Sequence, residues 1–227
     1  MALKRVVTQE LLDTDAGTAE EVAASLADLR WFNRYFGGLS TTAALLSRVT
    51  KKLGSGRLTY LDVAGASGDG GCAARKQLNR HGVELELTVV DRTVSHLRHR
   101  MAAEEPIVVA ADAFSLPFAD RSFDVAGSSL FLHHLEPDEI IAVVNESLRV
   151  SCAAIVINDL YRTYVHWLAA WAGVPLYRSR ITRYDAPASV RRAYTMDEMR
   201  SILKKTNARE IEASRHFFYR MGFILWQ

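Results

Sequence analysis

The sequence predicts an α/β protein built on a parallel, doubly wound sheet. Residues 54–157 alternate short apolar, β-branched runs with segments of helical periodicity. Because each helix carries the chain back to the start of the next strand, such alternation is typical of parallel sheets. The expected strands lie near 58–63, 85–90, 107–111, 124–129 and 153–157, and the expected helices near 70–80, 93–102 and 137–149.

Composition narrows the class of protein. The 227 residues are 49% hydrophobic and carry a formal net charge of +2. This apolar content suits one sizeable core, and the near-zero charge provides no general attraction to nucleic acid or to a membrane surface. The N-terminus lacks the apolar core of a signal peptide, and no apolar run reaches the roughly 18 residues of a membrane span. We expect a cytoplasmic protein in which Cys72 and Cys152 stay reduced.

Residues 1–53 precede the first strand and are expected to form an N-terminal helical cap, with the remaining domain at 54–227. The run Thr18-Ala-Glu-Glu21 has the pattern of a capping box, and apolar residues follow it at helical spacing. The aromatic residues of this region either form the inner face of the cap or pack on the sheet; they are Trp31, Phe32, Tyr35 and Phe36. Arg34 lies among them, and a cation in this setting is expected to find a carboxylate.

The first strand ends in a glycine-rich turn with the sequence Asp62-Val-Ala-Gly-Ala-Ser-Gly-Asp69. Small residues let a backbone approach a ligand closely, and the start of the following helix presents free N–H groups. The turn matches neither the dinucleotide pattern G-x-G-x-x-G nor the phosphate-binding P-loop, and it has no cation before Arg75. We therefore expect a ligand that is not held by a phosphate.

Acidic residues also follow the next two strands. Asp91 ends the second strand, about twenty residues beyond the turn, where an α/β nucleoside site places an acid on the ribose hydroxyls. The third strand leads into Asp112-Ala-Phe114, and the next segment reads Leu116-Pro-Phe-Ala-Asp-Arg-Ser-Phe-Asp-Val125. The carboxyl ends of these strands should meet at one edge of the sheet.

Together these segments resemble the class I S-adenosylmethionine (SAM) methyltransferases. The turn is similar to that family's first motif, D-x-x-x-G-x-G-D, except that Ala66 replaces the usual middle glycine. The resemblance implies SAM as cofactor and S-adenosylhomocysteine (SAH) as product, with Asp91 on the ribose, residues 112–114 around the adenine and the 65–68 loop at the methionine part. The cofactor-binding residues it implies are Arg34, Asp62, Gly65, Ala66, Ser67, Gly68, Asp91, Arg92, Asp112, Ala113, Phe114 and Ser128.

The resemblance covers residues 55–157 by motif and the rest by architecture. It implies a Rossmann-like sheet of seven mostly parallel strands with helices on both faces. A helix near 196–206 and strands near 209–216 and 219–226 would complete the antiparallel edge of that sheet. Residues 158–195 interrupt the pattern, and about 160–195 would be a helical lid inserted after the fifth strand.

Catalytic candidates follow the fourth and fifth strands. The fourth strand leads into Ser128-Ser-Leu-Phe-Leu-His-His-Leu135, and Asp159 follows the fifth. A sulfonium is already a good leaving group, so the enzyme mainly has to align an acceptor and remove its proton. We expect His133 to be the base, Asp159 to orient it or to act as a second base, and His134 to lie nearer the cofactor, an arrangement similar to that of sugar and phenol O-methyltransferases.

Two alternatives stay open for these residues. The histidines would instead cap the strand and contact SAM without titrating, and Asp159 would be an ordinary acid at a strand end. No metal is expected, because Ser128 and Ser129 occupy the place where metal-dependent catechol methyltransferases carry an acid. The motif [N/D/S]-P-P-[Y/F] of methyltransferases that modify base amines is also missing.

The lid is rich in aromatic residues, which suit a flat acceptor. They would otherwise pack into a core or form an interfacial helix that dips into a bilayer. The arginines between 178 and 192 form either a basic rim for an acidic substrate or a solvated surface. The expected substrate-binding residues of cap and lid are Trp31, Tyr35, Tyr161, Arg162, Trp167, Trp171 and Tyr194.

The expected function is methyl transfer from SAM to a hydroxyl oxygen of a small, phenolic molecule of secondary metabolism. The alternatives are C-methylation of a quinone or phenol ring, and a SAM-binding subunit without catalysis. We expect a small-molecule acceptor as partner, no nucleic acid, no stable membrane insertion, and a monomer or homodimer.

Overall fold

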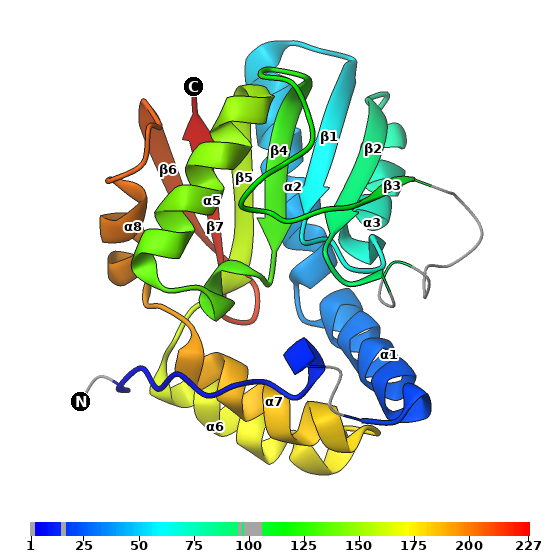
Figure 1. Ribbon diagram of the computed structural model, residues 1–227, viewed down its shortest axis with the longest axis vertical. Coiled ribbons are helices and arrows are strands. Elements are labelled where there is room, and N and C mark those ends of the chain that lie inside the picture. The colour runs from blue at the N-terminus through cyan, green and yellow to red at the C-terminus, as the bar shows by residue number, and fades with distance from the viewer. Residues whose placement is uncertain (1–2, 15–16, 95–96, 98–105) are drawn as a thin grey trace.

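The computed structural model describes residues 3–14, 17–94, 97 and 106–227, and it confirms the α/β class. One sheet of seven strands has the order β3-β2-β1-β4-β5-β7-β6 (Figure 1). Strands β1 to β5 pair in parallel, and β7 is antiparallel to both of its neighbours. The strands are β1 Arg57–Val63, β2 Glu84–Asp91, β3 Ile107–Ala110, β4 Phe123–Ser129, β5 Ser151–Leu160, β6 Glu210–His216 and β7 Arg220–Trp226.

Helices cover both faces of the sheet. One face carries α2 (Gly38–Leu53) and α3 (Asp69–Asn79), and the other carries α5 (Pro137–Val150) and α8 (Met196–Leu203). Successive side chains of a strand point to opposite faces, so neighbours such as Tyr60 and Leu61 enter different cores. Burial of both faces explains why the strands read as nearly continuous apolar runs.

A third layer lies beyond the carboxyl ends of the parallel strands. It contains α1 (Ala19–Tyr35), α6 (Tyr164–Ala172) and α7 (Arg180–Arg192), with the short helices η1 (Leu12–Thr14) and η3 (Val174–Leu176) (Figure 1). Another short helix, η2 (Leu132–His134), follows β4. The helical lid after β5 is thus confirmed, and the expected capping box at Thr18 and Glu21 starts α1.

The two N-terminal helices have different neighbours. Helix α1 packs against α7 of the lid, whereas α2 packs against α3 and the strands β5 and β7. The division of the chain into 1–53 and 54–227 stays a prediction, and in the structure α2 belongs to the layer that covers the sheet. The helix expected near 93–102 falls largely outside the described residues.

The segment before α1 forms a strap, residues 3–14, that runs along α7 (Figure 1). The N–H of Val6 donates to the carbonyl of Arg191 at 3.0 Å. Farther along, the N–H groups of Leu11 and Leu12 donate to the two carboxylate oxygens of Asp185, at 2.8 and 3.1 Å. These bonds fix the position of Glu10 in the layer beyond the sheet.

Crossing a bilayer requires a long and strongly apolar helix, and none of the helices in the described part of the chain meets both conditions.

Candidate active site

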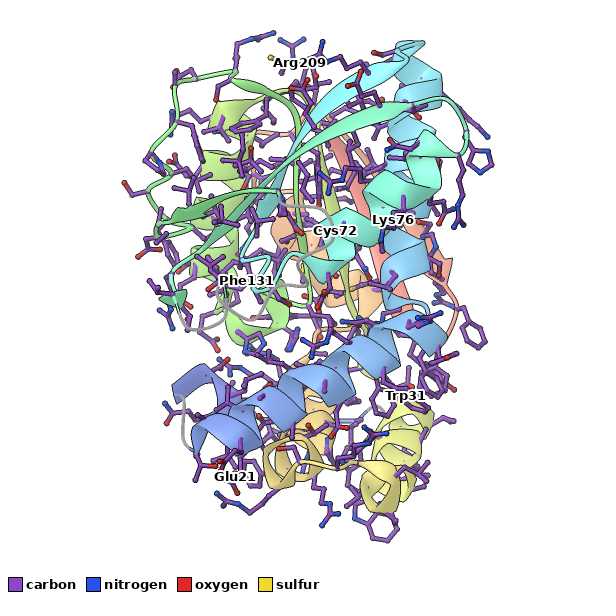
Figure 2. The ribbon with its side chains drawn as sticks, turned by 90° about the vertical axis from the view of Figure 1, so that its right-hand side faces the viewer. Glu21, Trp31, Cys72, Lys76, Phe131 and Arg209 are labelled. Atoms are coloured by element: carbon purple, nitrogen blue, oxygen red, sulfur yellow. The ribbon has the colours of Figure 1, made fainter. Side chains whose placement is uncertain are left out.

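A cavity of about 710 Å³ lies between the carboxyl ends of the parallel strands and the layer formed by the strap, α1, α6 and α7. Open α/β sheets bind ligands at this edge. Its walls come from the turns after β1 to β4 and from the three helices opposite them. Figure 2 shows Phe131 at this edge of the sheet, facing α1, and Trp31 toward the end of α1.

The glycine-rich turn after β1 is held by the end of β2. Ala66 has a φ of 48°, in the left-handed region, and its N–H donates to Asp91 Oδ2 at 2.9 Å. The left-handed conformation costs a residue with a Cβ roughly 1–2 kcal/mol, and the bond to Asp91 helps to hold it. Gly65, in contrast, cannot be replaced by a larger residue without a clash, because an added Cβ would lie 2.9 Å from the side chains of Asp62 and Val89. The turn thus accommodates the alanine that departs from the motif.

Two buried acids lie beneath this turn. Asp91 accepts from Ala66 and, through Oδ1, from the N–H of Thr93 at 2.8 Å. Asp62 is only 2% exposed. Burial raises the pKa of Asp62 to about 7, and the negative charge of Asp91 adds to the rise. A cationic ligand in the cavity would therefore favour ionisation of Asp62.

Most of the expected cofactor-binding residues line this part of the cavity. Asp112 Oδ1 accepts from the N–H of Phe114 at 3.0 Å and shapes the turn after β3. Gly68 lies just behind, as the N-cap of α3. The expected cofactor-binding residues that line the cavity are Asp62, Gly65, Ala66, Ser67, Asp91, Arg92, Asp112, Ala113 and Phe114.

The structure places Arg34 and Ser128 outside the cavity. Arg34 is exposed in the last turn of α1, with its guanidinium 5.8 Å from the ring centroid of Tyr35. Ser128 is buried within β4, and the alternation of the strand brings Ser129 to the cavity in its place.

Arg30, one turn before Arg34, lines the cavity instead. Its Nη1 lies 4.0 Å from Asp69 Oδ2 and is buried without a hydrogen-bond partner among the described residues. Ser67, in the glycine-rich turn, donates to the same oxygen of Asp69 at 2.7 Å. A guanidinium in this position beside the turn can bind a carboxylate.

The side chain of His133 is held by Asp159. Its backbone N–H donates to Asp159 Oδ2 at 3.0 Å, and its Nδ1 lies 2.7 Å from Asp159 Oδ1. A carboxylate only accepts, so Nδ1 carries a hydrogen, and in the neutral ring Nε2 is the acceptor. His133 lines the cavity although it is only 2% exposed. Burial opposes ionisation of Asp159, but the charge and hydrogen bond of His133 hold the pKa of Asp159 below its ordinary value.

His134 and Glu10 lie beside His133. His134 Nδ1 is 2.9 Å from Asp13 Oδ2, and the two histidine rings are 4.1 Å apart. Glu10 Oε1 lies 3.8 Å from His133 Nε2 and makes no hydrogen bond among the described residues. Burial, partly offset by the charge of His134, raises the pKa of Glu10 to about 7.

These three residues also offer possible metal ligands. One ligand atom each from Glu10, His133 and His134 lies within 4.8 Å of the others. The bond between His134 and Asp13 occupies one ring nitrogen of that set.

The expected substrate-binding residues are mostly directed elsewhere. Trp31 lines the cavity. Helix α6 turns its small residues and His166 toward the cavity, so Trp171 is 64% exposed on the outer side. The other expected residues that do not line the cavity are Tyr35, Tyr161, Arg162, Trp167 and Tyr194.

Two of these residues instead tie the lid to the core. Arg162 donates to both carboxylate oxygens of Glu198, at 2.8 and 2.9 Å, and to the carbonyl of Leu3 at 2.7 Å. The hydroxyl of Tyr194 donates to the carbonyl of Leu135 at 2.8 Å.

Sequence reasoning missed several residues of the cavity. Glu10 and Arg220 belong to no motif and reach the site from opposite ends of the chain. Arg30 was detectable as a second arginine one turn before Arg34. The aromatic side chains that line the cavity and were also missed are Phe131, Tyr177 and Phe218.

Comparison with known proteins agrees with this geometry. Residues 61–153 match the family described as "Methyltransferase domain". No curated protein matches the sequence. The matched residues include the glycine-rich turn, Asp91, Asp112 and the histidine pair.

Solved structures share the fold at low sequence identity. The structure of the plantazolicin methyltransferase BpumL in complex with SAH has a TM-score of 0.67 and 12% identity, and the match covers 96% of this chain and 99% of that one. BpumL with a pentazolic desmethylPZN analog and SAH gives 0.63 and 14%, over 91% and 96%. A SAM-dependent methyltransferase from Aquifex aeolicus gives 0.57 and 17%, over 79% and 88%. Residues 61–153 therefore form a methyltransferase domain, and the chain has the fold of the class I SAM-dependent methyltransferases.

Proposed function

We propose that this protein transfers the methyl group of SAM to a hydroxyl oxygen of a small aromatic acceptor. The observation that carries the proposal is the pair formed by His133 and Asp159, which opens into the same cavity as the glycine-rich turn. A base and a cofactor site that share one cavity are what transfer to a protonated hydroxyl requires.

The cofactor would lie over the ends of β1 to β3. Each oxygen of Asp91 already accepts one backbone N–H, and its remaining lone pairs can accept the ribose hydroxyls. Residues 112–114 would surround the adenine, and the 65–68 turn would hold the methionine part with Arg30 at its carboxylate. The complexes of BpumL with SAH support this placement, since they show a product of this cofactor in a protein of the same fold.

When bound, SAM supplies an electrophilic methyl group on a positively charged sulfur. The task of this chain is to orient the acceptor and remove its proton. The acceptor hydroxyl would donate to His133 Nε2, which takes up the proton as the new carbon–oxygen bond forms. Asp159 would keep the ring in the required tautomer and stabilise the resulting imidazolium.

The cavity walls suit an apolar acceptor. The half away from the glycine-rich turn is lined mainly by apolar and aromatic side chains, which are Leu26, Leu29, Phe32, Phe36, Leu130, Phe131, Tyr177 and Phe218. Such walls bind flat molecules and exclude water, while a few polar groups fix their orientation. Trp31 would complete this surface near the end of α1.

C-methylation of a phenol or quinone ring is the second candidate, because the same base would remove the phenolic proton before the ring carbon attacks. A SAM-binding subunit without catalysis is the non-enzymatic alternative. The expected role in secondary metabolism, the cytoplasmic location and the monomeric or homodimeric state stay predictions.

A methyl-transfer screen tests the proposal. Purified protein is incubated with methyl-labelled SAM and a panel of phenols, hydroxyquinones and polyketide-like aromatics. We expect SAH together with a methylated product, and NMR of that product separates oxygen from carbon attachment. Binding of SAM without turnover on any acceptor would favour the SAM-binding subunit without catalysis. Failure to bind SAM would overturn the proposed methyl-transfer function.

A further inference from the structure

A buried arginine borders the acceptor half of the cavity. Arg220 is the first residue of β7 and pairs with Leu160 at the carboxyl end of β5. Its side chain lines the cavity although the residue is only 5% exposed. In the sheet, β4 and β5 separate β7 from β1, β2 and β3, so Arg220 lies on the side of the cavity away from the proposed cofactor site.

The hydrogen-bonding capacity of Arg220 is only partly used. Its Nη2 donates to Asn33 Oδ1 at 2.9 Å. Its Nη1 is buried and has no hydrogen-bond partner among the described residues. A buried guanidinium with an unused donor carries a desolvation cost that a bound anion would offset.

No carboxylate of the described chain neutralises this cation at close range. Among the described residues, the polar contact of its guanidinium is with Asn33 rather than with an Asp or Glu at ion-pair distance, although the charge of Asp159 attracts it from farther away. The oxygens of Asp159 are engaged by His133 and by the N–H of Leu160, at distances between 2.7 and 3.0 Å. Burial lowers the pKa of Arg220 to about 10, so the group stays cationic at neutral pH.

In the adjoining wall, the described side chain of His166 is neutral at pH 7. Burial lowers the pKa of His166 to about 4, and the positive charge of Arg220 adds to the effect. His166 Nδ1 lies 3.1 Å from the carbonyl of Tyr161, and its ring stacks on Tyr219 at 4.8 Å. Phe218 lies beside His166 and is also part of the cavity wall. The guanidinium of Arg220, with its unpaired Nη1, therefore supplies a positive charge beside the neutral His166 and the aromatic Phe218.

We propose that Arg220 binds a carboxylate of the acceptor, so that the preferred substrates are aromatic acids that carry a hydroxyl group. This inference rests on the proposed function and names the substrate class of the same site. A planar carboxylate can accept from Nη1 while its aromatic body lies against Phe218 and the other apolar walls. The hydroxyl at the other end of the molecule would then face His133.

The test compares acceptors that differ only in charge. Hydroxybenzoates and hydroxycinnamates are each paired with the corresponding carboxamide, which has nearly the same shape. We expect the acids to bind to the protein saturated with SAH about 10- to 100-fold more tightly than the amides, and to show a similar preference in kcat/KM. Equal binding of acids and amides would overturn the proposal.

Substitution of the arginine separates its role from that of the cofactor site. Arg220→Gln should abolish the preference for acids while SAM affinity changes by less than about threefold. Arg215→Gln is the matched control, because Arg215 is an exposed arginine of the neighbouring strand β6 that does not line the cavity. Retention of the preference in Arg220→Gln, or a loss of SAM affinity as large as the loss of acid affinity, would contradict the assignment.

The binding measurements also distinguish this inference from the proposed function. If the protein binds acids through Arg220 but methylates none of them, the inference stands and the methyl-transfer proposal fails for this acceptor class. If it methylates phenols without regard to charge, the methyl-transfer proposal stands and the inference fails. Should Arg220→Gln not fold, the comparison of acids with amides in the unaltered protein still decides.

Discussion

The two halves of the cavity are built in different ways. The proposed cofactor half is formed by the turns after β1, β2 and β3, within residues 62–114, together with Arg30 of α1. The proposed acceptor half combines the strap, the other cavity-lining residues of α1, the turn after β4, the lid helices and the start of β7, and its residues range from Glu10 to Arg220. The first half is fixed by local spacing on a rigid sheet, whereas the second depends on how distant segments pack. Substitutions should therefore affect cofactor binding or acceptor chemistry separately.

The largest effect is expected at His133. His133→Ala should lower kcat by about 10²- to 10⁴-fold while SAM affinity stays nearly unchanged, because the proposed base would contact the acceptor and not the cofactor. Steady-state kinetics with the best acceptor of the screen, together with calorimetric titration of SAM, measure both quantities.

His134→Ala is the matched control for this experiment. His134 is bonded to Asp13 rather than to Asp159, so its loss should affect kcat much less. Full activity of His133→Ala would remove the base from the mechanism and leave proximity as the source of catalysis.

Asp91 should show the opposite pattern. Asp91→Ala removes the proposed ribose contact and the bond that holds the N–H of Ala66, and we expect SAM affinity to fall by about 1–3 kcal/mol, which corresponds to about 5- to 150-fold. At saturating SAM, kcat should change far less than in His133→Ala. An unchanged dissociation constant in calorimetry would place the cofactor elsewhere.

The two arginines of α1 provide a sharper comparison. Arg30→Met should weaken SAM binding about tenfold, because it removes the buried Nη1 beside Asp69 that we expect to bind the carboxylate of the cofactor. Arg34→Met, one turn farther along and exposed, should leave the affinity within about twofold of the unaltered protein. Calorimetric titrations of the two variants check this, and a larger effect at Arg34 would reverse the assignment.

The smallest expected effect is the release of protons when SAM binds and the pH dependence of SAM affinity that follows from it. Each half holds a buried carboxyl whose pKa is raised to about 7, Asp62 in the cofactor half and Glu10 in the acceptor half. Cationic SAM favours the ionised form of Asp62 and lowers its pKa, so binding near pH 6 should release a fraction of a proton. SAM affinity should accordingly rise between pH 6 and 8, by up to about tenfold.

Calorimetry in buffers of different ionisation enthalpy measures this proton release. Asp62→Asn should abolish it, whereas Glu10→Gln should retain it because Glu10 lies beside the histidines rather than beneath the glycine-rich turn. Equal release in the unaltered protein and in Asp62→Asn would show that another group titrates.

The difference between the halves also explains what the sequence could predict. The strands, the capping box of α1 and the helices on both faces follow from local patterns, and the structure confirms them. Asp91 and Asp112 were found because the end of a parallel strand locates a residue before any tertiary contact is known. The ends of the strands were predicted less accurately. Strand β5 was expected to end at residue 157, but it continues to Leu160 because its last residues pair with the distant strand β7.

The residues of the acceptor half were harder to find for the same reason. Glu10 reaches His133 only because Asp185, 174 residues from Leu11, binds the strap. The aromatic residues of α6 formed the strongest pattern in the lid, yet helix packing turns His166 and small residues inward and leaves Trp171 exposed. A single sequence carries no local signal for which face of such a helix meets the cavity.

A crystal structure of the protein with SAH tests the central claim most directly. We expect the ribose on Asp91, the adenine beside residues 112–114 and the sulfur directed toward the part of the cavity that contains His133. SAH bound against Arg220 and the lid, or a cofactor half that stays empty at saturating SAH, would contradict the account.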